Sequence, residues 1–94
     1  MPAMRAYLDD FGSITIWMEK NFYGGKSDSF FLVAEDGYMK ELVVKKLVEH
    51  DTRVKYEMTC PSDLPFGKDY KVREIHGLTV PLEIRMIVKR PEFN

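Results

Sequence analysis

Hydrophobic and polar residues alternate along most of this chain, which is the pattern of a β-strand with one buried face. The clearest case is residues 52–60, TRVKYEMTC, in which every second side chain is apolar. The same period of two extends over residues 78–88 and over residues 13–18. Shorter strands are predicted for residues 30–34 and 70–75. The pattern therefore predicts an all-β protein.

Turn-forming residues separate these predicted strands. Residues 35–37, 61–67 and 76–77 each lie between two alternating runs and contain glycine or proline, which favour a reversal of the chain. Short strands at this spacing are typical of a sandwich. We therefore predict an antiparallel, immunoglobulin-like β-sandwich of about six to seven strands. Because Pro81 cannot donate to a strand ladder, it should lie at a sheet edge or divide its strand in two.

Residues 38–50, YMKELVVKKLVEH, fit two kinds of secondary structure. Met39, Leu42, Val43 and Leu47 have helical spacing, but the segment also alternates with a period of two. Its β-branched valines favour a strand, although this preference is weak. We predict a strand.

Length and charge limit the expected partners. With 94 residues, the chain is long enough for one domain with one core. Its 14 basic and 15 acidic residues produce no net field that attracts polyanions, so nucleic acid is not an expected partner. It has no run of 18 apolar residues, and MPAMRAYLDDFG lacks the apolar core of a signal peptide, so we expect no membrane partner. The compartment stays undetermined.

No arrangement of residues predicts catalysis. A hydrolase needs a nucleophile with its base, two carboxylates that face one bond, or a metal site, and the sequence brings no such groups together. His50 and His76 lie at or near turns without a predicted partner, and Cys60 is expected to be a small buried side chain. Calcium at Asp9 or Asp10 is a minor alternative. We predict no enzyme activity, no cofactor and no metal site for this chain.

Four aromatic residues are candidates for a binding surface. Tyr7 and Trp17 alternate with apolar neighbours and share their faces with polar residues, while Phe22 and Tyr23 precede a pair of glycines. Aromatic rings beside polar side chains suit sugars, whose apolar face stacks while their hydroxyls form hydrogen bonds. The alternative for Trp17 and Phe22 is burial in a second layer, and we expect the glycines to turn Phe22 inward and Tyr23 outward. The rings expected to be buried are Phe30, Tyr56, Phe66 and Tyr70.

Five stretches of the sequence resemble one protein family. They are AYLDD followed by SITI within residues 6–16, YGGKSDSFFLVAEDG, VKYEMTC, FGKDY, and IHGLTVPLEI, which continues into VKRPEF. In this order, and over essentially the whole chain, they resemble the N-terminal β-domain of bacterial type I pullulanases, a carbohydrate-binding module. The resemblance implies a strand at residues 38–48. It also implies a module of residues 1–90, with residues 91–94 beginning a linker to a following domain.

The resemblance implies a function as well. The chain would be a non-catalytic module of a bacterial glycoside hydrolase, cytoplasmic or secreted, whose catalytic domain cleaves α-1,6 bonds. It would bind α-glucans such as pullulan and maltooligosaccharides weakly and so raise their concentration near that domain. Tyr7 and Asp9 match the opening motif of the family. Together with the exposed rings, they give the predicted sugar-binding residues Tyr7, Asp9, Trp17, Phe22 and Tyr23.

The chain departs from the family pattern in its last strand, where an aspartate and a glycine are usual and Pro81 and Arg85 stand instead. A glycine would admit close approach of a ligand, and Arg85 fills that space. A second hypothesis is that the domain binds no sugar and docks onto neighbouring domains of the same enzyme. Its docking face would be flat and continuous with the tail near Phe93.

Overall fold

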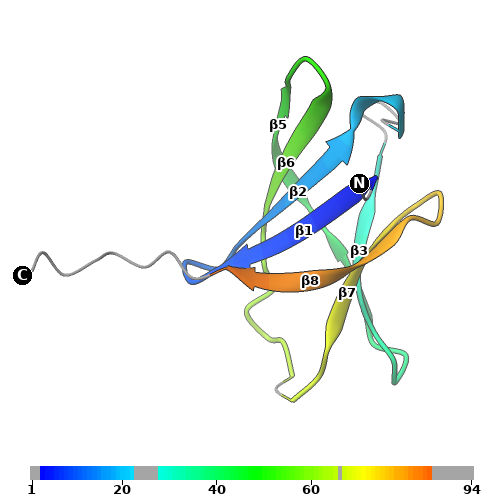
Figure 1. The fold of residues 1–94 in the computed structure, drawn as a ribbon. Helices are drawn as coiled ribbons and strands as arrows, with labels where there is room; N and C mark the ends of the chain where they lie inside the picture. Colours follow the sequence, from blue (N-terminus) through cyan, green and yellow to red (C-terminus); the bar gives the residue numbers. More distant parts are fainter. Residues whose placement is uncertain (1–2, 23–27, 66, 86–94) are drawn as a thin grey trace, which may run out of the picture.

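The computed structural model describes residues 3–22, 28–65 and 67–85, which form an all-β fold (Figure 1). A 3-10 turn, η1 (Lys20–Phe22), follows the second strand, and the described residues include no helix long and apolar enough to cross a membrane. The prediction of an all-β fold is confirmed, although the described residues form eight strands instead of the expected six to seven. The strands are β1 (Met4–Asp9), β2 (Ser13–Glu19), β3 (Phe30–Ala34), β4 (Met39–Leu42), β5 (Val44–Glu49), β6 (Arg53–Thr59), β7 (Tyr70–Glu74) and β8 (Thr79–Arg85).

The strands form one curled sheet in the order β4-β3-β7-β8-β1-β2-β6-β5. Val43 alone separates β4 from β5, yet these two strands lie at opposite ends of the order. The segment predicted as one strand is therefore divided at Val43, and the two ends of the sheet meet where the chain passes through this residue. The curled sheet encloses one core between its halves, in the manner of a sandwich (Figure 1).

Pro81 marks the point at which β8 changes its partner. Thr79, Val80 and Pro81 pair with β7 in antiparallel register, whereas the residues from Leu82 to Arg85 pair with β1. The second pairing is parallel, unlike every other pairing of the described strands. β8 nevertheless runs through Pro81 as one strand between β7 and β1, so the prediction that the proline lies at an edge or divides its strand is wrong. A residue without an N–H is tolerated here because the ladder with β7 ends at Pro81.

Burial follows the predicted alternation. On β1, β2 and β6, Ala6 pairs with Ile16 and Ile16 with Tyr56, and all three side chains point inward. Ring centroids of Phe30 on β3 and Tyr56 on β6 lie 4.7 Å apart in an edge-to-face contact, which joins the two halves of the sheet. The buried hydrophobic residues are Met4, Ala6, Ile14, Ile16, Met18, Phe30, Leu32, Leu42, Val54, Tyr56, Met58 and Val72.

Of the other residues expected to be buried, none is fully buried in the described part of the chain. Tyr70 and Cys60 are only half-buried, and both pack against the core. Burial raises the pKa of the Cys60 thiol, which is the behaviour of a structural rather than a reactive cysteine. Phe66 lies outside the described residues.

Removing the ring of Phe30 should destabilise the fold far more than removing an exposed ring. Phe30 is fully buried, so Phe30→Ala is expected to lower the free energy of unfolding by about 3–5 kcal/mol. Phe11 is 76% exposed, so the same substitution there should change it by less than about 0.5 kcal/mol. Urea denaturation of both variants measures these values. Equal losses would contradict the assignment of Phe30 to the core.

Candidate functional site

The candidate site lies on the outer face of β1 and β2. Tyr7 and Trp17 both point away from the core because they alternate with the buried residues of their strands. In the strand register Trp17 lies opposite Arg5 on one side and Lys55 on the other, while Tyr7 lies opposite Thr15. The two aromatic residues are therefore diagonal neighbours on adjacent strands, within reach of the same ligand.

An arginine stacks on each of these rings. The guanidinium carbon of Arg53 lies 4.1 Å from the centroid of the Trp17 ring, and that of Arg85 lies 4.0 Å from the centroid of the Tyr7 ring. These are cation–π contacts, which contribute about 0.5–1 kcal/mol at exposed sites. Arg5 also donates a hydrogen bond of 3.3 Å to the Tyr7 hydroxyl. The guanidinium groups hold both rings in place and cover one face of each.

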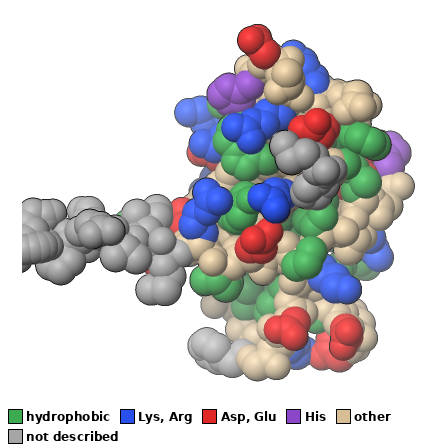
Figure 2. Space-filling model, in the orientation of Figure 1, with side chains coloured by type: hydrophobic (Ala, Val, Ile, Leu, Met, Phe, Trp, Pro, Cys, Tyr) green, Lys and Arg blue, Asp and Glu red, His purple; other side chains and the backbone are tan. Residues whose placement is uncertain are grey.

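Two hollows flank the aromatic pair. One has a volume of about 410 Å³ and is lined by Tyr7 and Trp17 together with the three arginines and Glu19. The other, of about 250 Å³, is lined by the same two rings with Asp9, Thr15 and Lys55. Figure 2 shows basic and hydrophobic side chains side by side on the face turned to the viewer. The surface thus combines apolar ring edges with donors and acceptors of hydrogen bonds. We call it the Tyr7–Trp17 groove.

The structure brings together three of the five residues predicted to bind sugar. Tyr7, Asp9 and Trp17 line the Tyr7–Trp17 groove. Asp9 also stabilises the turn after β1, because its Oδ1 accepts hydrogen bonds from the backbone N–H groups of Phe11 and Ser13. Tyr23 lies outside the described residues.

Phe22 does not behave as predicted. It was expected to turn inward, but its side chain is 48% exposed. Phe22 ends η1, and none of the three residues of this turn is buried. It also lines neither hollow of the Tyr7–Trp17 groove. The inward prediction for Phe22 is therefore wrong.

The basic residues of the groove were missed by the sequence reasoning. Arg53 and Lys55 alternate with buried residues of β6, so the pattern places them outward, but it does not reveal which strand lies next to β2. Arg85 was expected to fill the space of a family glycine, and it stacks on Tyr7.

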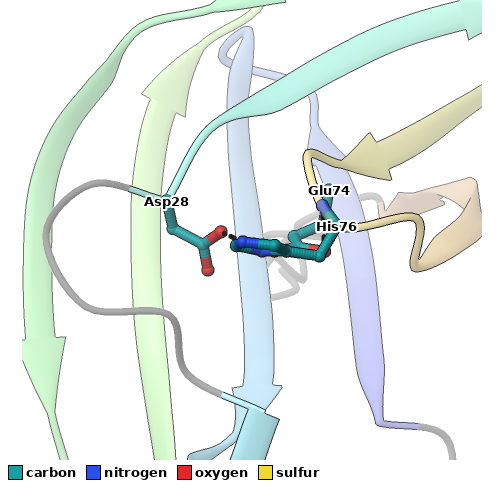
Figure 3. A group of neighbouring side chains, drawn as sticks. All are labelled: Asp28, Glu74 and His76. Atoms are coloured by element: carbon teal, nitrogen blue, oxygen red, sulfur yellow. Dashed lines mark hydrogen bonds and ion pairs between the residues drawn. The ribbon is translucent and has the colours of Figure 1, made fainter.

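A second group of polar side chains lies at the start of β3. Asp28 and Glu74 are buried, and the imidazole of His76 lies against both carboxylates (Figure 3). The His76 Nδ1 atom is 2.5 Å from Oε2 of Glu74 and 3.7 Å from Oδ1 of Asp28. Sequence spacing relates Glu74 to His76 but gives no signal for Asp28, which is distant in the chain.

The pKa values in this group shift in opposite directions. Burial alone would raise the pKa of Glu74, but hydrogen bonds with Asp28, with the His76 ring and with the His76 backbone N–H lower it below its ordinary value. The hydrogen bond that the imidazole donates to Glu74, together with the negative charge of that carboxylate, raises the pKa of His76. The group therefore favours the protonated form of the His76 imidazole beside its carboxylates.

An apolar hollow of about 650 Å³ lies where β8 ends. Its walls include Leu8, Leu82, Ile84, Leu64 and Tyr70. Ile84 is 69% exposed although it pairs with Leu8, whose side chain packs against the core. Phe93, which was expected near such a surface, lies outside the described residues.

Comparisons with known proteins give one consistent result. The family model described as the pullulanase N1-terminal domain matches residues 4–89. A search of curated proteins finds no match. The crystal structure of a pullulanase from Anoxybacillus sp. LM18-11 complexed with maltotriose shares 28% sequence identity over 96% of this chain, with a TM-score of 0.76.

A second solved structure has the same fold. The type I pullulanase from Bacillus subtilis str. 168, complexed with maltose, matches 99% of this chain at 24% identity, with a TM-score of 0.77. The chain spans about 13% of the length of each of these two pullulanase chains. It therefore corresponds in size to one small domain of such a protein.

The contact between Arg53 and Trp17 can be measured directly, because the chain has a single tryptophan. Arg53→Ala should uncover the ring, so quenching of its fluorescence by acrylamide should increase, while the free energy of unfolding falls by at most about 1 kcal/mol. Arg85→Ala is the matched control, since this guanidinium covers Tyr7 instead. If both variants changed the quenching equally, the arginine over Trp17 would be misassigned.

Proposed function

The chain belongs to the pullulanase N1-terminal domain family, and from this premise we propose that it is a non-catalytic module that binds α-glucan chains for a pullulanase-type glycoside hydrolase. The ligands would be pullulan and maltooligosaccharides. Binding would hold the polymer near a catalytic domain and raise its effective concentration there. The observation that carries the proposal is the Tyr7–Trp17 groove, in which two aromatic rings lie among hydrogen-bonding side chains.

The chemistry of the groove suits a neutral sugar. The ring edges of Tyr7 and Trp17 offer apolar contact to the carbon face of a glucose unit, and the guanidinium groups donate hydrogen bonds to its hydroxyls. Asp9 and Glu19 supply acceptors for hydroxyl protons. The lining has four basic and two acidic side chains, so it offers both donors and acceptors to a ligand rich in hydroxyls.

The expected affinity is low. If a sugar covers about half of an aromatic side chain, burial contributes roughly 2–3 kcal/mol per ring before the costs of association. A glucan that displaces a guanidinium group from a ring loses about 0.5–1 kcal/mol of cation–π energy. A millimolar complex requires about 4 kcal/mol, so both rings and several hydrogen bonds are needed. Weak binding is enough for a module that acts by local concentration.

The competing hypothesis is a docking domain without a sugar site. It is supported by the apolar hollow beside Ile84, which lies at the end of β8 and has mostly apolar walls. A neighbouring domain of the same enzyme would be its occupant, since contacts between domains are partly apolar. This hypothesis predicts that maltooligosaccharides leave the Tyr7–Trp17 groove unperturbed.

Titration of the ¹⁵N-labelled chain with maltotriose separates the two hypotheses. We expect saturable amide shifts around the groove, with a Kd in the millimolar range. Tyr7→Ala and Trp17→Ala should each weaken binding by about tenfold, which corresponds to ~1.4 kcal/mol of lost contact.

Phe11→Ala is the control for this titration, because Phe11 is an exposed ring that lines neither hollow of the groove. Its affinity for maltotriose should match that of the unmodified chain. No shifts at tens of millimolar maltotriose, or equal weakening by Phe11→Ala, would refute the glucan proposal for this chain.

A further inference from the structure

The group formed by Asp28, Glu74 and His76 is assembled by the pairing of two strands. Asp28 lies just before β3, Glu74 ends β7, and His76 lies in the turn to β8. Phe30 on β3 is directly opposite Glu74 on β7, so the register of the sheet fixes the two carboxylates near each other. One ligating atom from each of the three residues lies within 4.8 Å of the other two.

Each carboxylate is oriented by a hydrogen bond to one of its oxygens. The Tyr56 hydroxyl donates to Oδ2 of Asp28 at 3.3 Å, and the backbone N–H of His76 donates to Oε1 of Glu74 at 2.9 Å. The other oxygens, Oδ1 and Oε2, are those that lie near the Nδ1 atom of His76. Outer hydrogen bonds of this kind orient the ligands of metal ions in proteins. The three atoms are thus directed at a common point.

Charge favours a divalent cation at that point. The side chains of Asp28 and Glu74 are 0% and 1% exposed, so two carboxylates share a site with little water. Buried carboxylates need a proton or a cation to offset their loss of hydration. In the structure, a protonated imidazole and the proton shared by the hydrogen-bonded carboxyl groups of Glu74 and Asp28 offset these charges. A divalent ion with a neutral imidazole would provide the same two positive charges and release both protons. The ion would take the place of the proton on Nδ1.

The distances are those of hydrogen-bonded groups, and they come within about 1 Å of the ligand spacing of a zinc site. Tetrahedral ligands at about 2.0 Å from zinc lie about 3.3 Å from one another. To reach this value, the separation of 2.5 Å between Nδ1 and Oε2 would lengthen by about 0.8 Å, and the 3.7 Å between Nδ1 and Oδ1 would shorten by about 0.4 Å. Both changes correspond to a shift of the exposed His76 imidazole from Glu74 toward Asp28.

We propose that Asp28, Glu74 and His76 form a binding site for a divalent transition metal ion, with zinc as the fitting example. Imidazole as one of three ligands favours zinc over calcium or magnesium, which prefer oxygen ligands only. The His76 side chain is 71% exposed, so the ion has a path from solvent and keeps a position for water. Bound metal would tie the turn after β7 to the start of β3. This site is independent of the Tyr7–Trp17 groove.

Calorimetric titration of the chelator-treated chain with ZnCl₂ tests the proposal. We expect one Zn²⁺ per chain, together with a change in the ¹⁵N shift of His76 Nδ1. His76→Gln should lower the affinity at least about tenfold, because it removes the one nitrogen ligand of the site. Glu74→Gln should have the same effect, provided that the variant keeps the amide spectrum of the folded chain.

His50→Gln is the matched control, because His50 is the other histidine of the chain and lies against Trp17. Its affinity for Zn²⁺ should stay within twofold of the unmodified chain. The proposal is overturned if ZnCl₂ gives no saturable binding up to millimolar concentration, or if His50→Gln weakens binding as much as His76→Gln. Equally tight binding of Ca²⁺ would overturn the assignment of the metal class.

Discussion

The contact between Phe30 and Tyr56 is the interaction on which the arrangement of the two halves of the sheet depends. Phe30 belongs to the part formed by β3, β4 and β7, and Tyr56 belongs to the part formed by β1, β2, β5 and β6. Their rings meet edge to face in the core. Such pairs add about 0.5–1.5 kcal/mol to the effect of burial alone. The hydroxyl of Tyr56 also reaches Asp28, so the same side chain connects the apolar core to the buried carboxylates.

The Tyr7–Trp17 groove follows from the way in which this core is filled. Because Ala6, Ile16 and Met18 must point inward, their neighbours Tyr7 and Trp17 must point outward, and strand pairing sets them side by side. A one-residue shift of register would exchange the two faces and lose both the core and the groove. The proposed binding face is therefore placed by the strands of the sheet. This arrangement suits the proposed role, in which a fixed surface meets a flexible polymer.

Much of the fold could be predicted from the sequence, because one-sided burial leaves a period of two that local reading detects. The period of two predicted β6 and β3 closely. Pro81 was expected to lie at an edge or to divide its strand, and it instead marks the change of partner within a continuous β8. Alternation within a strand does not determine which strands become neighbours in the sheet. For this reason the stacking of Arg53 on Trp17 and the approach of Asp28 to Glu74 were not predicted. The exposure of Phe22 was not predicted because this residue lies in η1, outside the strands, where alternation gives no information on burial.

Intermolecular nuclear Overhauser effects between maltotriose and the aromatic ring protons would show which side chains the sugar contacts. Binding in the Tyr7–Trp17 groove predicts cross-peaks from the sugar to the rings of both Tyr7 and Trp17, since the two residues line the same hollows. Cross-peaks confined to Leu82 and Ile84 in the hollow at the end of β8, or to neither region, would contradict it.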